Sequence, residues 1–142
     1  MKGWTLIKGV AVSIIFFLLI GLNTRASDGA ELQKVRATCY CHAGITASGQ
    51  HTREGVIAAK REWIGKAVAL YSCSEGDELG EFIGYFEILD TGIGIDTDGD
   101  GKGDSITRGK SIDIYKYTLD DCKAFVKEHG DYVYMKLIDA EG

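Results

Sequence analysis

The chain has 142 residues, about the size of a single domain. Its 16 Lys and Arg residues are outnumbered by 21 Asp and Glu residues, so the formal net charge is −5. Such a surface repels polyanions, which argues against nucleic acid as a partner.

Residues 1–26 have the three parts of a secretory signal peptide. Lys2 and Lys8 supply positive charge, an apolar run follows at 10–22, and Thr-Arg-Ala at 24–26 offers the small residues that a signal peptidase reads. The run is shorter than the ~20 residues of a membrane span. We expect a cleaved signal peptide, with an uncleaved N-terminal anchor as the alternative. Either way we expect the domain to be secreted or held in the cell envelope, and it contacts a membrane only through this segment if the segment is uncleaved.

Without this segment, 13 basic residues oppose 21 acidic ones, a net charge of −8. Such a surface permits a neutral polymer or a metal cation as ligand. Residues 27–34 form a short polar leader, and 35–142 form one domain that is long enough to bury a core without disulfides.

Six short segments have the alternation or the β-branched composition of strands, at 35–41, 56–59, 66–72, 82–90, 112–115 and 132–138. One helix is predicted near the C-terminus. Thr118 is its expected N-cap. Asp121, three residues later, is at the position whose side chain bonds back to the cap, and Gly130 follows the end of the helix. This pattern predicts a mainly β fold, a small closed or half-closed barrel with one helix.

The four cysteines are Cys39, Cys41, Cys73 and Cys122. Outside the cell they allow three pairings, and one disulfide or none is the simpler expectation. Cys39 and Cys41 share one face of a strand, so we do not expect them to bond to each other. With His42 and His51 they also offer zinc ligands, but one residue between the cysteines is fewer than zinc sites use. Cys41 beside His42 is a further candidate, as a nucleophile, and it lacks a third orienting group.

Two aspartates are candidate catalytic groups. Asp90 ends a strand and is followed by Thr91 and Gly92, a pattern shared by turns and by aspartic proteases. Only 50 residues follow Gly92, which argues against the protease. Asp113 lies between two isoleucines, on the opposite face of its strand. Partial burial beside another carboxylate would raise its pKa, so the two form a candidate acid/base pair.

A run of alternate aspartates resembles the first half of a calcium loop, with a glycine after the second and third. The candidate ligands are Asp96, Asp98, Asp100 and Asp104. The twelfth position holds Thr107 and not a bidentate glutamate. Calcium binding and a solvated acidic loop are both compatible with this pattern.

The order of these motifs resembles the three-aspartate (3D) domain of cell-wall lytic enzymes and of the membrane-bound lytic transglycosylase A family. The matching segments are 37–40 (Ala-Thr-Cys-Tyr), 45–49 (Ile-Thr-Ala-Ser-Gly), 55–59 (Gly-Val-Ile-Ala-Ala), 90–92 (Asp-Thr-Gly) and 109–115 (Gly-Lys-Ser-Ile-Asp-Ile-Tyr). The resemblance implies a six-stranded double-psi β-barrel with a groove for peptidoglycan glycan strands.

It also implies non-hydrolytic cleavage of the MurNAc–GlcNAc bond by Asp113 as general acid/base, oriented by Asp90 and requiring no cofactor. Tyr40, Thr46 and Ser48 are then expected to line the groove. Lys60 stands at the position of the family's first aspartate, where it either lowers the pKa of the acid or binds substrate. A non-catalytic glycan-binding or envelope-structural module of the same fold, stabilised by calcium, is the alternative.

Overall fold

The computed structural model describes residues 31–138, so the expected signal peptide lies outside the described residues. Six strands, one helix and one 3₁₀ turn (Arg61–Trp63) make up the domain. They follow one another as β1 (Gln33–Tyr40), β2 (Val56–Ala58), β3 (Ala67–Ser74), β4 (Glu78–Asp90), β5 (Ser111–Tyr115), α2 (Leu119–His129) and β6 (Tyr132–Ile138). The predicted mainly β class with one helix near the C-terminus is confirmed. Strand β4 is longer than predicted, since it begins at Glu78.

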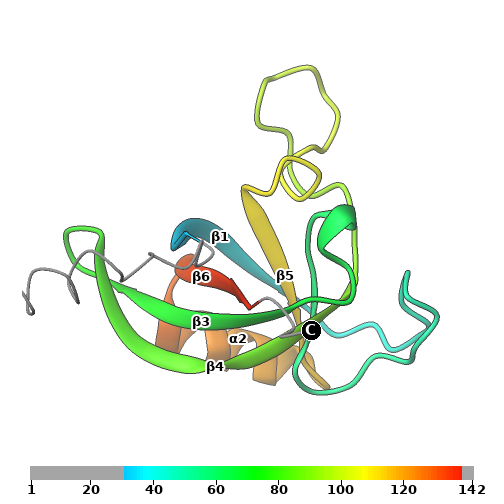
Figure 1. The fold of residues 1–142 in the computed structure, drawn as a ribbon, viewed down its shortest axis with the longest axis horizontal. Coiled ribbons are helices and arrows are strands. Elements are labelled where there is room, and N and C mark those ends of the chain that lie inside the picture. Colours follow the sequence, from blue (N-terminus) through cyan, green and yellow to red (C-terminus); the bar gives the residue numbers. More distant parts are fainter. Residues whose placement is uncertain (1–30, 139–142) are drawn as a thin grey trace, which may run out of the picture.

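The strands form one mixed sheet in the order β1-β5-β2-β4-β3-β6, and β6 pairs back to β1. Two of the pairs, β1–β5 and β2–β4, are parallel, and the other four are antiparallel. Every strand therefore has a neighbour on each side. Figure 1 shows this sheet with the segment between β4 and β5 projecting away from it as a loop.

The core lies on one face of the sheet, as the alternation of side chains requires. In β5, Ile112 and Ile114 are fully buried, and Asp113 between them is half-buried. The main cluster also takes side chains from every other strand and from the helix, for example Val35, Ile57, Leu70, Ile88, Phe125 and Met135.

Helix α2 begins and ends as its sequence predicts. Thr118 accepts a hydrogen bond from the Asp121 amide and donates one to its carboxylate, which satisfies a free amide of the first turn. Gly130 ends the helix with φ of 76°, a conformation that favours glycine. Within residues 31–138, no helix is long and apolar enough to cross a membrane.

A disulfide joins Cys39 of β1 to Cys122 of α2, across 83 positions of sequence. Cys41 and Cys73 are free thiols. The sequence left this pairing open, because strand and helix come together only in the fold. The disulfide removes Cys39 from the zinc ligand set considered above, so that set does not form.

Candidate functional site

The two candidate aspartates lie on either side of β2. Ala58 pairs with Asp113 of β5 on one side and with Asp90 of β4 on the other. The backbones of Asp90 and Asp113 are therefore two strand spacings apart, about 10 Å. Carboxylates on facing side chains at this separation come close enough to influence each other.

A β-bulge brings Asp90 to this position. The register runs from Ile57 opposite Ile88 to Ala58 opposite Asp90, so Leu89 is skipped. Without the shift, Ala58 would face Leu89, which is instead buried in a second apolar cluster. A bulge re-aims the side chains that follow it, and bulges are common beside functional sites.

Asp90 is held by three donors. Its Oδ1 accepts hydrogen bonds from the amides of Ala47 (3.0 Å) and Thr91 (2.9 Å), and its Oδ2 from the Tyr40 hydroxyl (3.4 Å). The Ser48 amide also donates to the carbonyl of Leu89, the preceding residue, at 2.9 Å. The Thr-Ala-Ser-Gly segment thus folds over the end of β4 and holds the Asp90 side chain in place.

Asp113 has different surroundings. It is half-buried, and its Oδ1 accepts one hydrogen bond, from the Thr38 hydroxyl, at 3.1 Å. Burial raises the pKa of Asp113 above its ordinary value, the Thr38 hydrogen bond opposes this, and the charge of Asp90 raises the pKa further. Of the two groups, Asp113 is therefore suited to hold a proton and donate it.

Tyr40 links the two carboxylates electrostatically. Burial and then the negative charges of Asp90 and Asp113 raise the pKa of its hydroxyl well above the ordinary tyrosine value. Its ring also stacks edge-on against Tyr115, with 5.4 Å between centroids. Tyr40 therefore keeps its proton at neutral pH and can donate it in a hydrogen bond to Asp90.

Asp113 opens into a cleft. A cavity of about 340 Å³ is lined by Asp113, Arg36 and Thr38 on the sheet, and by residues 92–95 of the loop that follows β4. A second cavity of about 490 Å³ is lined by Lys60, Thr91 and Thr107 and shares Gly92 and Ile93 with the first. The two cavities border each other along this loop. Asp90 lines neither of them.

The remaining predicted groove residues differ in burial and in their hydrogen-bond and ion-pair partners. Ser48 is exposed, but Thr46 is buried, and its hydroxyl donates to the Gln50 carbonyl at 2.8 Å and contacts the Ser48 hydroxyl. Thr46 therefore takes part in the hydrogen bonding of its own loop, and the linings of the two cavities described above include none of Tyr40, Thr46 and Ser48. Lys60 forms an ion pair with Glu62, and its ammonium lies 5.8 Å from the centre of the Trp63 ring.

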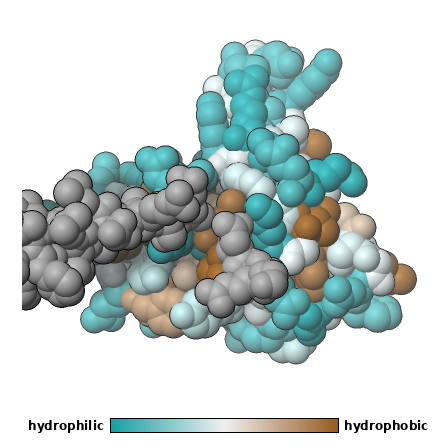
Figure 2. Space-filling model, in the orientation of Figure 1, coloured by the Kyte–Doolittle hydropathy of each residue, from teal (hydrophilic) through white to brown (hydrophobic). Residues whose placement is uncertain are grey.

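Three of the four predicted metal ligands gather in the projecting loop. The carboxylates of Asp96, Asp98 and Asp100, here called the acidic cluster, have oxygens within 4.8 Å of one another. The loop surface is hydrophilic in the space-filling view (Figure 2). Asp104 is not part of this group. It accepts hydrogen bonds from Thr97 and pairs with Arg108.

The acidic cluster is organised by its own backbone. The Asp96 carboxylate accepts hydrogen bonds from the amides of Asp98, Gly99 and Gly101, and these bonds lower its pKa. Arg108 also pairs with Asp98 at 2.6 Å. Three convergent carboxylates suit a hard cation such as calcium, and Arg108 supplies competing positive charge.

Sequence reasoning assigned no role to Thr38 or Arg36, although both line the cleft beside Asp113. The alternation of the strand could have identified them, because residues 36, 38 and 40 share one face of β1 and Tyr40 was predicted to line the groove. Comparison of the chain with protein-family models, curated proteins and solved structures found no match.

Proposed function

We propose that this protein is a 3D-type, double-psi β-barrel lytic transglycosylase that cleaves peptidoglycan with Asp113 as its general acid/base. One observation carries the proposal. Asp113, with a raised pKa, lines a cleft and lies across Ala58 from the hydrogen-bonded Asp90. A pair of carboxylates in different surroundings is the arrangement that separates a proton donor from a fixed charge.

In the proposed reaction, Asp113 donates its proton to the glycosidic oxygen as the bond from this oxygen to C1 of MurNAc breaks. Positive charge develops at the sugar ring, and Asp90 stabilises it electrostatically. The 6-hydroxyl of the same sugar then attacks C1 and returns its proton to Asp113. The products are a 1,6-anhydro sugar and a free 4-hydroxyl, so no water is consumed and the acid is regenerated.

The test is the release of anhydro-muropeptides from purified peptidoglycan, measured by mass spectrometry. Asp113→Asn removes the transferable proton and should lower the rate by about 10²- to 10⁴-fold. Asp120→Asn is the matched control, since Asp120 is an exposed residue of α2 that does not line the cleft. Equal product release by wild type and Asp113→Asn would refute the enzymatic proposal.

A non-catalytic glycan-binding module is the second candidate, and Lys60 is the observation that favours it. Lys60 stands where the resembled family has an aspartate, and its charge is paired with Glu62. A groove that holds glycan needs hydrogen-bonding side chains but no proton donor. Sedimentation with insoluble peptidoglycan by wild type and Asp113→Asn alike, without soluble products from either, would support this candidate.

Calcium at the acidic cluster would be structural under either proposal. The loop that carries the cluster continues into Ser105 and Ile106, which line the Asp113 cleft. A bound calcium ion would offset two of the three negative charges of the acidic cluster and stiffen this wall of the cleft. Neither proposed activity needs calcium in a chemical step.

An extracytoplasmic location is also part of the proposal. The disulfide between Cys39 and Cys122 is supporting evidence, because such bonds persist mainly in oxidising compartments. It agrees with the signal-peptide pattern at 1–26. Labelling of intact cells with a membrane-impermeant reagent would test it.

A further inference from the structure

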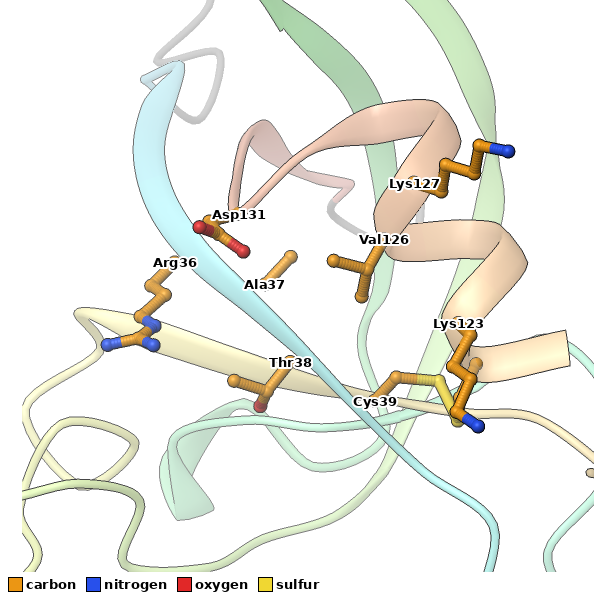
Figure 3. A pocket seen from close by; sticks show the side chains of 9 residues that line it. Arg36, Ala37, Thr38, Cys39, Lys123, Val126, Lys127 and Asp131 are labelled. Carbon is orange, nitrogen blue, oxygen red and sulfur yellow. A yellow bond between two sulfur atoms is a disulfide. The ribbon is translucent and has the colours of Figure 1, made fainter. Parts of the chain in front are cut away.

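A separate pocket of about 490 Å³ lies between β1 and α2. Figure 3 shows its lining, with Ala37, Val126 and the Cys39–Cys122 disulfide forming apolar walls. These walls are made of small apolar groups, which suit methyl-sized substituents.

One wall of this pocket is an unpaired strand edge. Pairing of β1 with β6 ends at Arg36, whereas pairing with β5 continues to Tyr40. The Ala37 amide then donates to the Asp131 carbonyl, on the side away from β5. Because successive amides alternate sides, the amide and carbonyl of Cys39 also face this way. A free edge of this kind accepts an extended peptide through main-chain hydrogen bonds.

The charged residues around the pocket are mainly basic. Arg36, Lys123 and Lys127 line it, against one acid, Asp131. Within residues 31–138, Arg36 and Lys127 have no ion-pair partner, and Lys123 lies 3.9 Å from the exposed Asp120, a weak pair. In a chain of net charge −5, this local excess of cations favours a ligand that carries carboxylates.

The pocket and the cleft of Asp113 lie on either side of β1. Arg36 and Thr38 are part of the lining of both cavities, so only this strand separates them. A ligand lying across Asp113 would reach the pocket with a branch that passes over β1. In Figure 3 the Arg36 and Thr38 side chains turn away from α2, toward the other side of the strand.

We propose that this pocket binds the peptide arm of the glycan strand: a short, extended peptide with small apolar side chains and free carboxylates. The identity of the ligand rests on the proposed function, since peptidoglycan is a glycan that carries such peptides. The peptide adds to the free edge of β1 at Cys39, places methyl groups against Ala37 and Val126, and pairs a carboxylate with Lys123.

The test compares three probes by calorimetry: a GlcNAc–MurNAc disaccharide with an alanine-containing peptide, the same disaccharide without it, and the peptide alone. Wild type should bind the peptide-bearing disaccharide at least tenfold more tightly than the bare one. Lys123→Glu and Val126→Trp should bring this ratio close to one. Lys136→Glu is the matched control, because Lys136 is exposed on β6 and lines no cavity described above.

A ratio near one in wild type, or a ratio unchanged in both variants, overturns the peptide site while leaving glycan binding intact. If neither disaccharide binds but the peptide alone shifts the amide resonances of Ala37 and Cys39, the peptide site stands and the glycan proposal falls. No binding of any probe overturns both. Circular dichroism confirms that each variant is folded.

Discussion

Removal of the Cys39–Cys122 disulfide should destabilise the protein more than any other change to its cysteines. The bond closes a loop of 83 residues, and a loop of this length removes much of the conformational freedom of the unfolded chain. The loop-entropy relation gives about 4.5 kcal/mol at 25 °C. For a domain of this size, that corresponds to a fall in Tm of about 15 °C.

The assay is urea and thermal unfolding of wild type and the Cys39→Ala/Cys122→Ala double variant, followed by circular dichroism. The matched control is Cys41→Ala/Cys73→Ala, which removes the two free thiols. The control should stay within about 1 kcal/mol of wild type. A reducing agent should lower the Tm of wild type and of the control, and should leave the Cys39→Ala/Cys122→Ala variant unchanged.

A second readout connects this bond to the cleft. Cys39 lies between Thr38 and Tyr40, whose hydroxyls donate to Asp113 and Asp90. Loss of the bond should therefore also weaken glycan binding or cleavage at temperatures where the variant is still folded. If wild type and the double variant unfold within 1 kcal/mol of each other, or if reduction leaves wild type unaffected, the reasoning is wrong.

Three further predictions concern the cleft and its loop. Asp90→Asn removes a negative charge that raises the pKa of Asp113, so Asp113 loses its proton at lower pH; the alkaline limb of the pH–rate profile should move to lower pH, and an unmoved limb would contradict the coupling. Gly94→Ala places a Cβ against Ser105 Oγ at φ of +78°, whereas Gly99→Ala, at φ of +82°, meets open space. Urea unfolding should show Gly94→Ala less stable than Gly99→Ala by about 1–3 kcal/mol, and equal losses would argue against the tight packing of this loop. Calcium at ~10 mM, roughly 10 to 100 times the Kd of an extracellular site, should raise Tm by several degrees relative to EDTA; a Tm unmoved by either would remove calcium from the acidic cluster.

The strands and the helix were predictable because local patterns determine them. In β5, one aspartate between two isoleucines fixes which face is buried, and Thr118 with Gly130 marks both ends of α2. The start of β4 was not predicted because residues 78–81 are mostly exposed, so apolar and polar side chains do not alternate there. Exposed hairpin residues carry a weak pattern signal.

The site was only partly predictable. Asp90 and Asp113 could be paired by resemblance, but the bulge that turns Asp90 toward Ala58 depends on how Leu89 packs with Val56. Such a register shift results from tertiary packing, so the local sequence pattern does not predict it. The hydrogen bond from Thr46 to the Gln50 carbonyl was not predictable for a related reason, because a threonine hydroxyl in a loop can bond either to the backbone or to a ligand.

Strand β1, the first of the six, completes its hydrogen bonds only with β5 and β6, which come from the last third of the chain. During synthesis, its backbone groups thus stay without strand partners until nearly the whole domain has been made. Contacts between such distant segments close slowly. Under the proposed export, a chain that delays folding in this way stays unfolded enough to pass through a translocation channel, and it would form its structure and then its disulfide on the far side.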